Sequence, residues 1–141
     1  MLSSNGKLGR FTEAQRDTYP QALSELRAGR KQTHWMWFIF PQLAGLGQSS
    51  TSQYYALKDI EEAQAYLEDP VLGARLKACT EAVLEVSGKT ATEIFGGIDS
   101  LKFRSSLTLF CQAAGPGSLF HHALDKYFEG EPDARTLELL D

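Results

Sequence analysis

The sequence predicts a compact all-α single-domain bundle of about eight mostly short helices. Apolar residues recur at intervals of three or four, the spacing of one helix face, and residues that favour helix N-termini precede these runs. The aromatic density of residues 34–40 would also suit a strand, but no second strand-like run exists to pair with it. We therefore expect a short helix at 34–40, capped by Thr33.

The N-terminal part of the chain predicts two short helices. Thr12, with Gln15 three residues later, has the pattern of a capping box. Pro20 interrupts the apolar stripe that follows. We therefore expect a second helix over 20–28, closed by Gly29 in a left-handed conformation.

Helix starts recur along the rest of the chain. A loop of small residues, 44–52, is expected to end at a helix N-terminus around Ser50. Later cap signals each precede an apolar run with helical spacing: Asp59 with Glu62, Asp69 before Pro70, Thr90 with Glu93, and Asp99. The longest run predicts a helix over 70–87 with Gly88 just after its end.

The C-terminal quarter predicts three more helix boundaries. Gly115, Pro116 and Gly117 in sequence break the helix that contains Leu107 and Phe110. The apolar positions of 119–128 then predict another helix, closed by Gly130. Pro132 and Asp133 introduce a last turn of helix.

The composition describes a single domain, residues 1–141, in which we expect 1–10 to be a loosely ordered segment. The chain is 43% hydrophobic and 11% aromatic, enough to fill a core, which argues against intrinsic disorder. No apolar run reaches the roughly 20 residues that cross a bilayer, so no membrane association is expected. Cys79 and Cys111 lie in apolar segments without metal spacing and are interpreted as buried thiols in a reducing cytoplasm.

The net charge of −4 is unevenly distributed. Residues 1–48 hold six lysines and arginines against three acids, whereas 49–141 hold eight against fifteen. A protein that binds bulk nucleic acid is usually basic overall, and this chain is not. Its basic first third favours a local site for an anionic small molecule. Neither a cofactor nor an oligomeric state is indicated by the sequence.

The densest aromatic segment, residues 30–42, has two interpretations. Trp35 and Trp37 can anchor the core, or they can form with Lys31 a wall on which a base or nicotinamide ring stacks. His34 can exchange a proton near neutral pH, or it can be a structural hydrogen-bonding residue. We name Lys31, Trp35 and Trp37 as candidate ligand-binding residues and His34 as the candidate acid or base.

The glycine and serine loop has the chemistry of an anion site. Gly45 and Gly47 let the backbone approach a ligand closely, and the N–H groups of the helix start at Ser50 favour a phosphate. An ordinary loop with a serine cap is the alternative, since the lysine of a P-loop is missing. Tyr54 follows closely enough to face either the same cavity or the core.

A third candidate segment lies early in a predicted helix. Lys102 and Ser105 share one helix face, where a cation in the first turn opposes the helix dipole. Asp99 or a bound anion should compensate, although a solvated surface pair gives the same pattern. His121 and His122 have no partners at ligand spacing, so no metal site is expected.

Long motifs across the chain resemble the bacterial domain-of-unknown-function 1810 family. The matching strings are THWMWFIFPQL at 33–43, SQYYA at 52–56, PVLGARL at 70–76, EIFG at 93–96 and LKFRSSLTLF at 101–110. The resemblance implies a small, mainly helical protein with no established activity. Some members are labelled calpastatin, but such protease inhibitors are disordered and poor in aromatics, whereas this composition suits a packed core.

The chain is also similar to the NAD- and ADP-ribose-associated N-glycosidase proteins. The similarity lies at 53–56, 70–75 and Lys102 with Phe103. It implies hydrolysis of an N-glycosidic bond. The chain departs from that group in having Ser52 and Gln53 where the group has an acidic residue and a histidine.

Two functions are therefore expected from the sequence. The first is binding, and possible N-glycosidase-like processing, of a nucleotide or ADP-ribose-like anion, with Glu93 or Asp99 stabilising positive charge on the sugar. It requires the three candidate segments to meet around one polar hollow. The alternative is a non-catalytic helical module that binds a protein partner or a metabolite.

Overall fold

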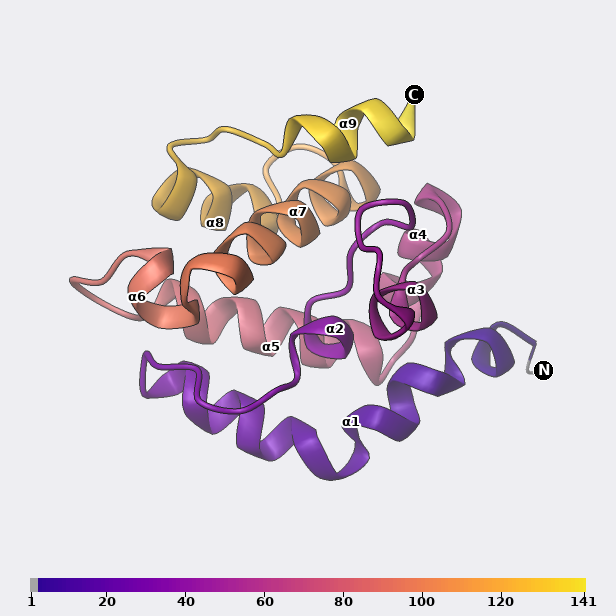
Figure 1. Ribbon diagram of the computed structural model, residues 1–141, viewed down its shortest axis with the longest axis horizontal. Helices are drawn as coiled ribbons and strands as arrows, with labels where there is room; N and C mark the ends of the chain where they lie inside the picture. Colours follow the sequence, from indigo (N-terminus) through magenta and orange to yellow (C-terminus); the bar gives the residue numbers. More distant parts are fainter. Residues whose placement is uncertain (1–2) are drawn as a thin grey trace.

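The computed structural model describes residues 3–141 and is all-α, as predicted. The described part of the chain contains nine helices: α1 Ser3–Arg27, α2 Met36–Ile39, α3 Ser50–Tyr55, α4 Ile60–Glu68, α5 Leu72–Leu84, α6 Ala91–Phe95, α7 Gly97–Ala114, α8 Leu119–Phe128 and α9 Ala134–Leu140. Its one β-type pairing is an isolated bridge between Leu43 and Leu57. In Figure 1, α7 runs through the middle, with α8 and α9 on one side and α5 and α1 on the other.

The prediction of two short N-terminal helices was wrong, because α1 is one helix that contains Pro20. It also begins at Ser3, so most of the segment expected to be loosely ordered is helical, and Thr12 lies inside the helix rather than at its cap. Phe11 and Leu26, on either side of the proline, are both fully buried. Burial of one apolar face offsets the backbone hydrogen bond that Pro20 removes. Figure 1 shows α1 as a bent helix.

The short helix predicted after Thr33 is α2, but Thr33 does not cap it. The helix begins at Met36, after Trp35, and has no side-chain cap. The Thr33 hydroxyl instead donates to the carboxylate of Glu25, 2.7 Å away. A hydrogen bond from the hydroxyl to a charged carboxylate is stronger than one that the hydroxyl would accept from a backbone N–H at the helix start. The Thr33 side chain therefore points toward Glu25 of α1.

Most predicted caps in the C-terminal two thirds are confirmed. The side chains of Asp59, Thr90 and Asp133 accept backbone N–H groups in the first turns of α4, α6 and α9. The helix predicted over 70–87 is shorter at both ends, Leu72–Leu84, and at its start the carboxylate of Asp69 accepts the N–H groups of Val71 and Leu72. Helix α7 starts at Gly97, so Asp99 lies in its first turn rather than at its cap.

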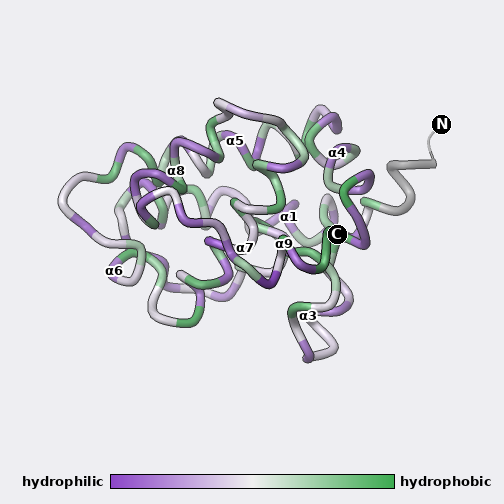
Figure 2. The backbone as a smooth tube through the Cα atoms, turned by 90° about the horizontal axis from the view of Figure 1, so that it is seen from above, coloured by the Kyte–Doolittle hydropathy of each residue, from purple (hydrophilic) through white to green (hydrophobic). Residues whose placement is uncertain are grey.

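The core is rich in aromatic rings and lies between α1, α5 and α7. The rings of Phe40, Phe95 and Phe103 pack together, with centroid distances of 4.5 to 5.9 Å. Figure 2 shows hydrophobic and hydrophilic residues interleaved along individual helices, as expected when each helix buries one face. Gly73 of α5 lies against the carbonyl of Leu67, where an added Cβ would collide with backbone.

Two further expectations concern the whole chain. Both cysteines are free and buried, and burial raises the pKa of each thiol to about 12. Within residues 3–141, none of the helices combines the length and apolarity needed to cross a membrane.

Candidate functional site

Three adjoining hollows lie where α2, α3 and the first half of α7 approach one another. The first hollow, about 500 Å³, is lined by Lys31, His34, Met36, Trp37, Phe95, Gly96, Gly97, Ile98 and Asp99. The second, about 250 Å³, is lined by Gln42, Leu46, Gly47, Ser52, Ile98, Leu101, Lys102, Ser105, Asp133 and Arg135. The third, about 560 Å³, is lined by Trp37, Phe38, Ser50, Thr51, Tyr54 and Tyr55. Trp37 borders the first and third hollows, and Ile98 borders the first and second.

The two tryptophans have different environments. Trp35 is fully buried, and its indole N–H donates to the carboxylate of Glu25 at 2.9 Å. Trp37 is partly exposed, and the Lys102 ammonium lies 5.1 Å from its ring centroid. Of the two rings named as candidate stacking surfaces, only that of Trp37 is therefore open to a ligand.

Asp99 connects the two candidate lysines. The Lys31 ammonium lies 2.9 Å from one carboxylate oxygen of Asp99, and the Lys102 ammonium lies 3.7 Å from the other. The Lys31 side chain is 8% exposed and the Lys102 side chain 25%. Because α7 begins at Gly97, Lys102 lies in its second turn, not in the first turn as predicted. Asp99, in the first turn, supplies the negative charge expected beside this cation, and Lys102 makes the longer and more exposed of the two ion pairs.

His34 is exposed on the loop before α2 and lines the first hollow. Among the described residues, its imidazole has no hydrogen-bond partner. The ring is therefore free to donate to, or accept from, a molecule in the first hollow.

The candidate residues of the glycine and serine loop and of the helix after it do not all line the same hollow. Gly47 lines the second hollow and approaches Ser52 so closely that an added Cβ would collide with that side chain. Ser50 and Tyr54 line the third. Gly45 has φ +102° and packs against Leu139 of α9, outside the lining of all three hollows.

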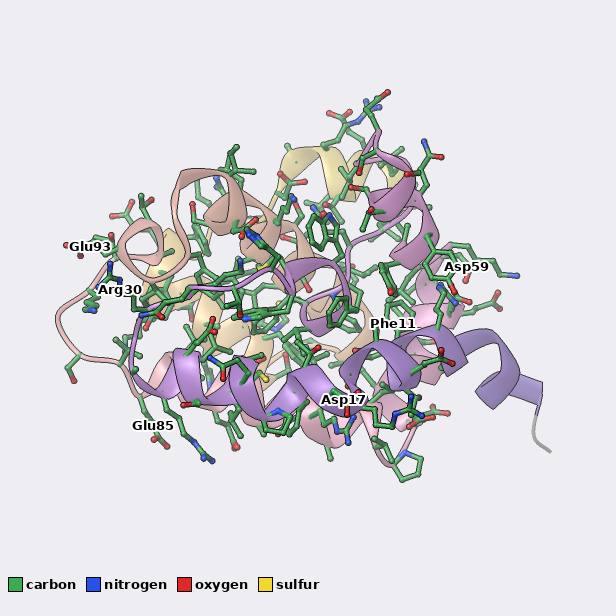
Figure 3. The ribbon with its side chains drawn as sticks, turned by 60° about the horizontal axis from the view of Figure 1, so that its bottom comes forward. Phe11, Asp17, Arg30, Asp59, Glu85 and Glu93 are labelled. Carbon is green, nitrogen blue, oxygen red and sulfur yellow. The ribbon has the colours of Figure 1, made fainter. Side chains whose placement is uncertain are left out.

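Glu93 lies apart from the other candidate residues. Its carboxylate accepts the backbone N–H of Thr90 at 2.8 Å, and the Thr90 hydroxyl accepts the N–H of Glu93 in return. This is a complete capping box at the start of α6. Figure 3 shows Glu93 at the edge of the molecule, pointing outward. Of the two carboxylates expected to act on a sugar, only Asp99 lines a hollow.

Together, the placements only partly match the single polar hollow that the first sequence hypothesis requires. Lys31, His34, Trp37 and Asp99 share the first hollow, whereas Lys102 and Ser105 line the second. The contacts of Lys102 with Trp37 and Asp99 connect the two. Among the described residues there is no group of three or more histidines, cysteines or acids that could hold a metal ion.

The residue that sequence reasoning missed is Glu25. Its side chain is buried, and burial alone would raise its pKa, but hydrogen bonds from Gln32, Thr33 and Gln21 lower the pKa from 4.5 to about 2. One signal was present in the sequence: Glu25 follows Ala22 by three residues and so falls on the buried face of its helix. A charged residue at such a position indicates a specific buried partner.

Comparisons with known proteins agree with this fold. A family model described as "Protein of unknown function (DUF1810)" matches residues 5–140. The chain is similar to the conserved hypothetical protein Rv1873 from Mycobacterium tuberculosis, for which a crystal structure is known. The two sequences are 50% identical, and the two structures superpose with a TM-score of 0.93. The alignment covers 94% of this chain and 95% of that one. No curated protein matches the chain.

Proposed function

Because the chain belongs to the DUF1810 family, whose description assigns no activity, we propose a function from the site alone: it binds a nucleotide or ADP-ribose-like anion. The observation that carries the proposal is the pairing of Trp37 with Lys102 at the boundary of the first two hollows. A partly exposed indole offers a stacking surface for a planar ring. The Lys102 ammonium, which lies over the indole ring, offers a charge for the phosphate that the sugar of the nucleotide carries.

Three polar residues of the first two hollows have roles in this proposal. Lys102 contacts the anionic oxygens, since its contact with Asp99 is long and its side chain is partly exposed. The Lys31 ammonium is held by the carboxylate of Asp99 and by the carbonyl of Thr33. It therefore raises the electrostatic potential of the hollow but does not move to contact the ligand directly. His34 donates a hydrogen bond to the ligand, or exchanges a proton with it.

Processing of the ligand is a second step of the proposal. In hydrolysis of an N-glycosidic bond the C–N bond to the base breaks, water adds to the sugar carbon, and the departing base takes up a proton. The sugar carries positive charge as the bond breaks, which a nearby carboxylate stabilises. Asp99 is the candidate for that role, because Glu93 is engaged in the α6 capping box. Exchange of Asp99 for Asn should then stop release of the base while the ligand still binds.

Isothermal titration tests the binding step, with AMP, ADP-ribose and NAD as charged ligands and adenosine as the uncharged control. We expect AMP to bind more tightly than adenosine, and Lys102→Gln to weaken AMP binding about tenfold or more. Lys77→Gln, an exposed lysine on α5, is the matched control and should leave the affinity unchanged. The proposal is wrong if no nucleotide binds at millimolar concentration, or if both lysine variants have the same effect.

One observation supports the alternative, a module that binds a protein. Ile98 and Leu101, one turn apart on α7, are 74% and 61% exposed. Exposed apolar side chains grouped in this way are typical of protein contact surfaces. If every nucleotide fails to bind and Leu101→Ser alters the state of association of the protein, this second function is favoured.

A further inference from the structure

The loop between α1 and α2, residues 28–35, carries two of the residues that line the first hollow. Lys31 and His34 both lie on it, and both depend on its backbone for their position. The loop contains no helix or strand. Something other than regular secondary structure must therefore fix its course.

Glu25 provides that fixation from inside α1. One carboxylate oxygen accepts three donors: the N–H of Gln32 at 2.8 Å, the N–H of Thr33 at 3.0 Å and the indole N–H of Trp35 at 2.9 Å. The other oxygen accepts the Thr33 hydroxyl at 2.7 Å and the amide of Gln21 at 2.8 Å. Four of these five donors belong to the loop.

The donor set is unusual because it holds no cation. All five groups that bond to Glu25 are neutral, and the residue is only 5% exposed. A buried carboxylate without a counter-charge is costly unless its hydrogen bonds are complete. An apolar residue at this position would pack α1 against α2 without that requirement. What the carboxylate adds is one defined loop conformation.

The hydrogen bonds to Glu25 hold the residues immediately before and after His34 in the chain. Thr33 before it and Trp35 after it are each held by Glu25, while the imidazole between them stays exposed and without a partner among the described residues. Lys31 is held at a third point, since its N–H donates to the carbonyl of Ile94 at 2.8 Å. The loop is therefore fixed, and the functional group on it remains available.

We infer that Glu25 is a positioning residue for the ligand site, holding the loop so that His34 and Lys31 face the first hollow. The inference rests on the proposed function. It assigns Glu25 no contact with the ligand: the carboxylate acts through the backbone N–H groups of Gln32 and Thr33, the Thr33 hydroxyl and the indole of Trp35.

The test compares Glu25→Gln with Leu124→Ala. Gln retains the size of the side chain but presents an amide to the loop donors. Leu124 is a buried residue of α8 that lines none of the three hollows, and its truncation destabilises the core. Two quantities are measured well below each melting temperature: AMP affinity, and hydrogen exchange at the amides of Gln32 and Thr33.

We expect Glu25→Gln to speed exchange at both amides by about a hundredfold or more and to weaken AMP binding about tenfold. Leu124→Ala should leave the affinity within about twofold of the wild type. If Glu25→Gln does not fold, Glu25→Asp tests the same point, because it keeps the charge but shortens the reach by one methylene.

The outcomes separate the two proposals. Wild-type affinity in a folded Glu25→Gln variant overturns the positioning role, and so does unchanged exchange at Gln32 and Thr33. If Leu124→Ala weakens AMP binding as strongly as Glu25→Gln does, general destabilisation explains the loss and the inference is wrong. Failure of the wild type to bind any nucleotide rejects the proposed function, and with it the ligand part of this inference, whereas the exchange data still report whether Glu25 holds the loop.

Discussion

The two tryptophans provide a matched pair of substitutions with opposite expected results. Trp35→Phe and Trp37→Phe make the same chemical change at positions separated by one residue. Trp35 is fully buried and hydrogen-bonded to Glu25, whereas Trp37 is partly exposed at the hollows. The first substitution should lower the free energy of unfolding substantially, and the second should lower it much less.

The magnitudes follow from the contacts of each ring. Trp35→Phe removes an indole N–H from a buried carboxylate, a hydrogen bond to a charged group worth about 1.5–3 kcal/mol. It also leaves unfilled volume in a closely packed core, so we expect a total loss of about 3 kcal/mol. Trp37→Phe keeps an aromatic face toward Lys102, and the cation–π contact at such an exposed position is worth only about 0.5–1 kcal/mol. Its loss should be below about 1 kcal/mol.

Guanidinium unfolding monitored by circular dichroism gives both free energies, and fluorescence gives an independent readout. Each variant retains one tryptophan. The emission of Trp35 alone should be blue-shifted and resistant to iodide, whereas Trp37 alone should be red-shifted and readily quenched. Equal losses of stability in the two variants, or equal quenching by iodide, would refute the assignment of one ring to the core and the other to the site.

Three further outcomes are expected. Because the Glu25 pKa falls from 4.5 unfolded to about 2 folded, its ionisation stabilises the fold above pH 4.5 by about 3 kcal/mol, at about 1.4 kcal/mol per pKa unit. Urea titrations should show this contribution disappearing as the pH falls from about 5 to 2, and Glu25→Gln should lack that part of the pH dependence. Gly73→Ala should destabilise the fold by about 1–3 kcal/mol, since the added Cβ meets a backbone carbonyl of α4. Gly9→Ala should stabilise the fold by about 0.5–1 kcal/mol, since the added Cβ lies in open space on α1 and alanine favours the helix. Thermal melts that rank the two variants in the opposite order contradict the packing described. Cys79 and Cys111, whose pKa is raised to about 12, should react with a thiol reagent at pH 8 only after unfolding, and rapid labelling of the native protein would show that a thiol is accessible.

The helix starts that were predicted correctly have local signals. The capping box of Thr90 and Glu93 and the caps of Asp59 and Asp133 depend on residues within one turn of each other. The fold class was also predictable from the sequence alone, since the spacing of apolar residues in each segment indicates a helix and the face that it buries. These features require no knowledge of which segments meet.

The candidate site depended on contacts that no local pattern reports. The continuation of α1 through Pro20, the burial of Trp35 rather than Trp37, and the pairing of Asp99 with Lys31 are decided by packing between distant segments. Glu93 is the opposite case, since the capping box that its local pattern predicted with Thr90 engages its carboxylate and leaves it out of the site. Spacing along a chain determines which face of a helix is apolar. Only the folded structure determines what that face meets, because burial and ion pairing arise from the close approach of groups far apart in sequence.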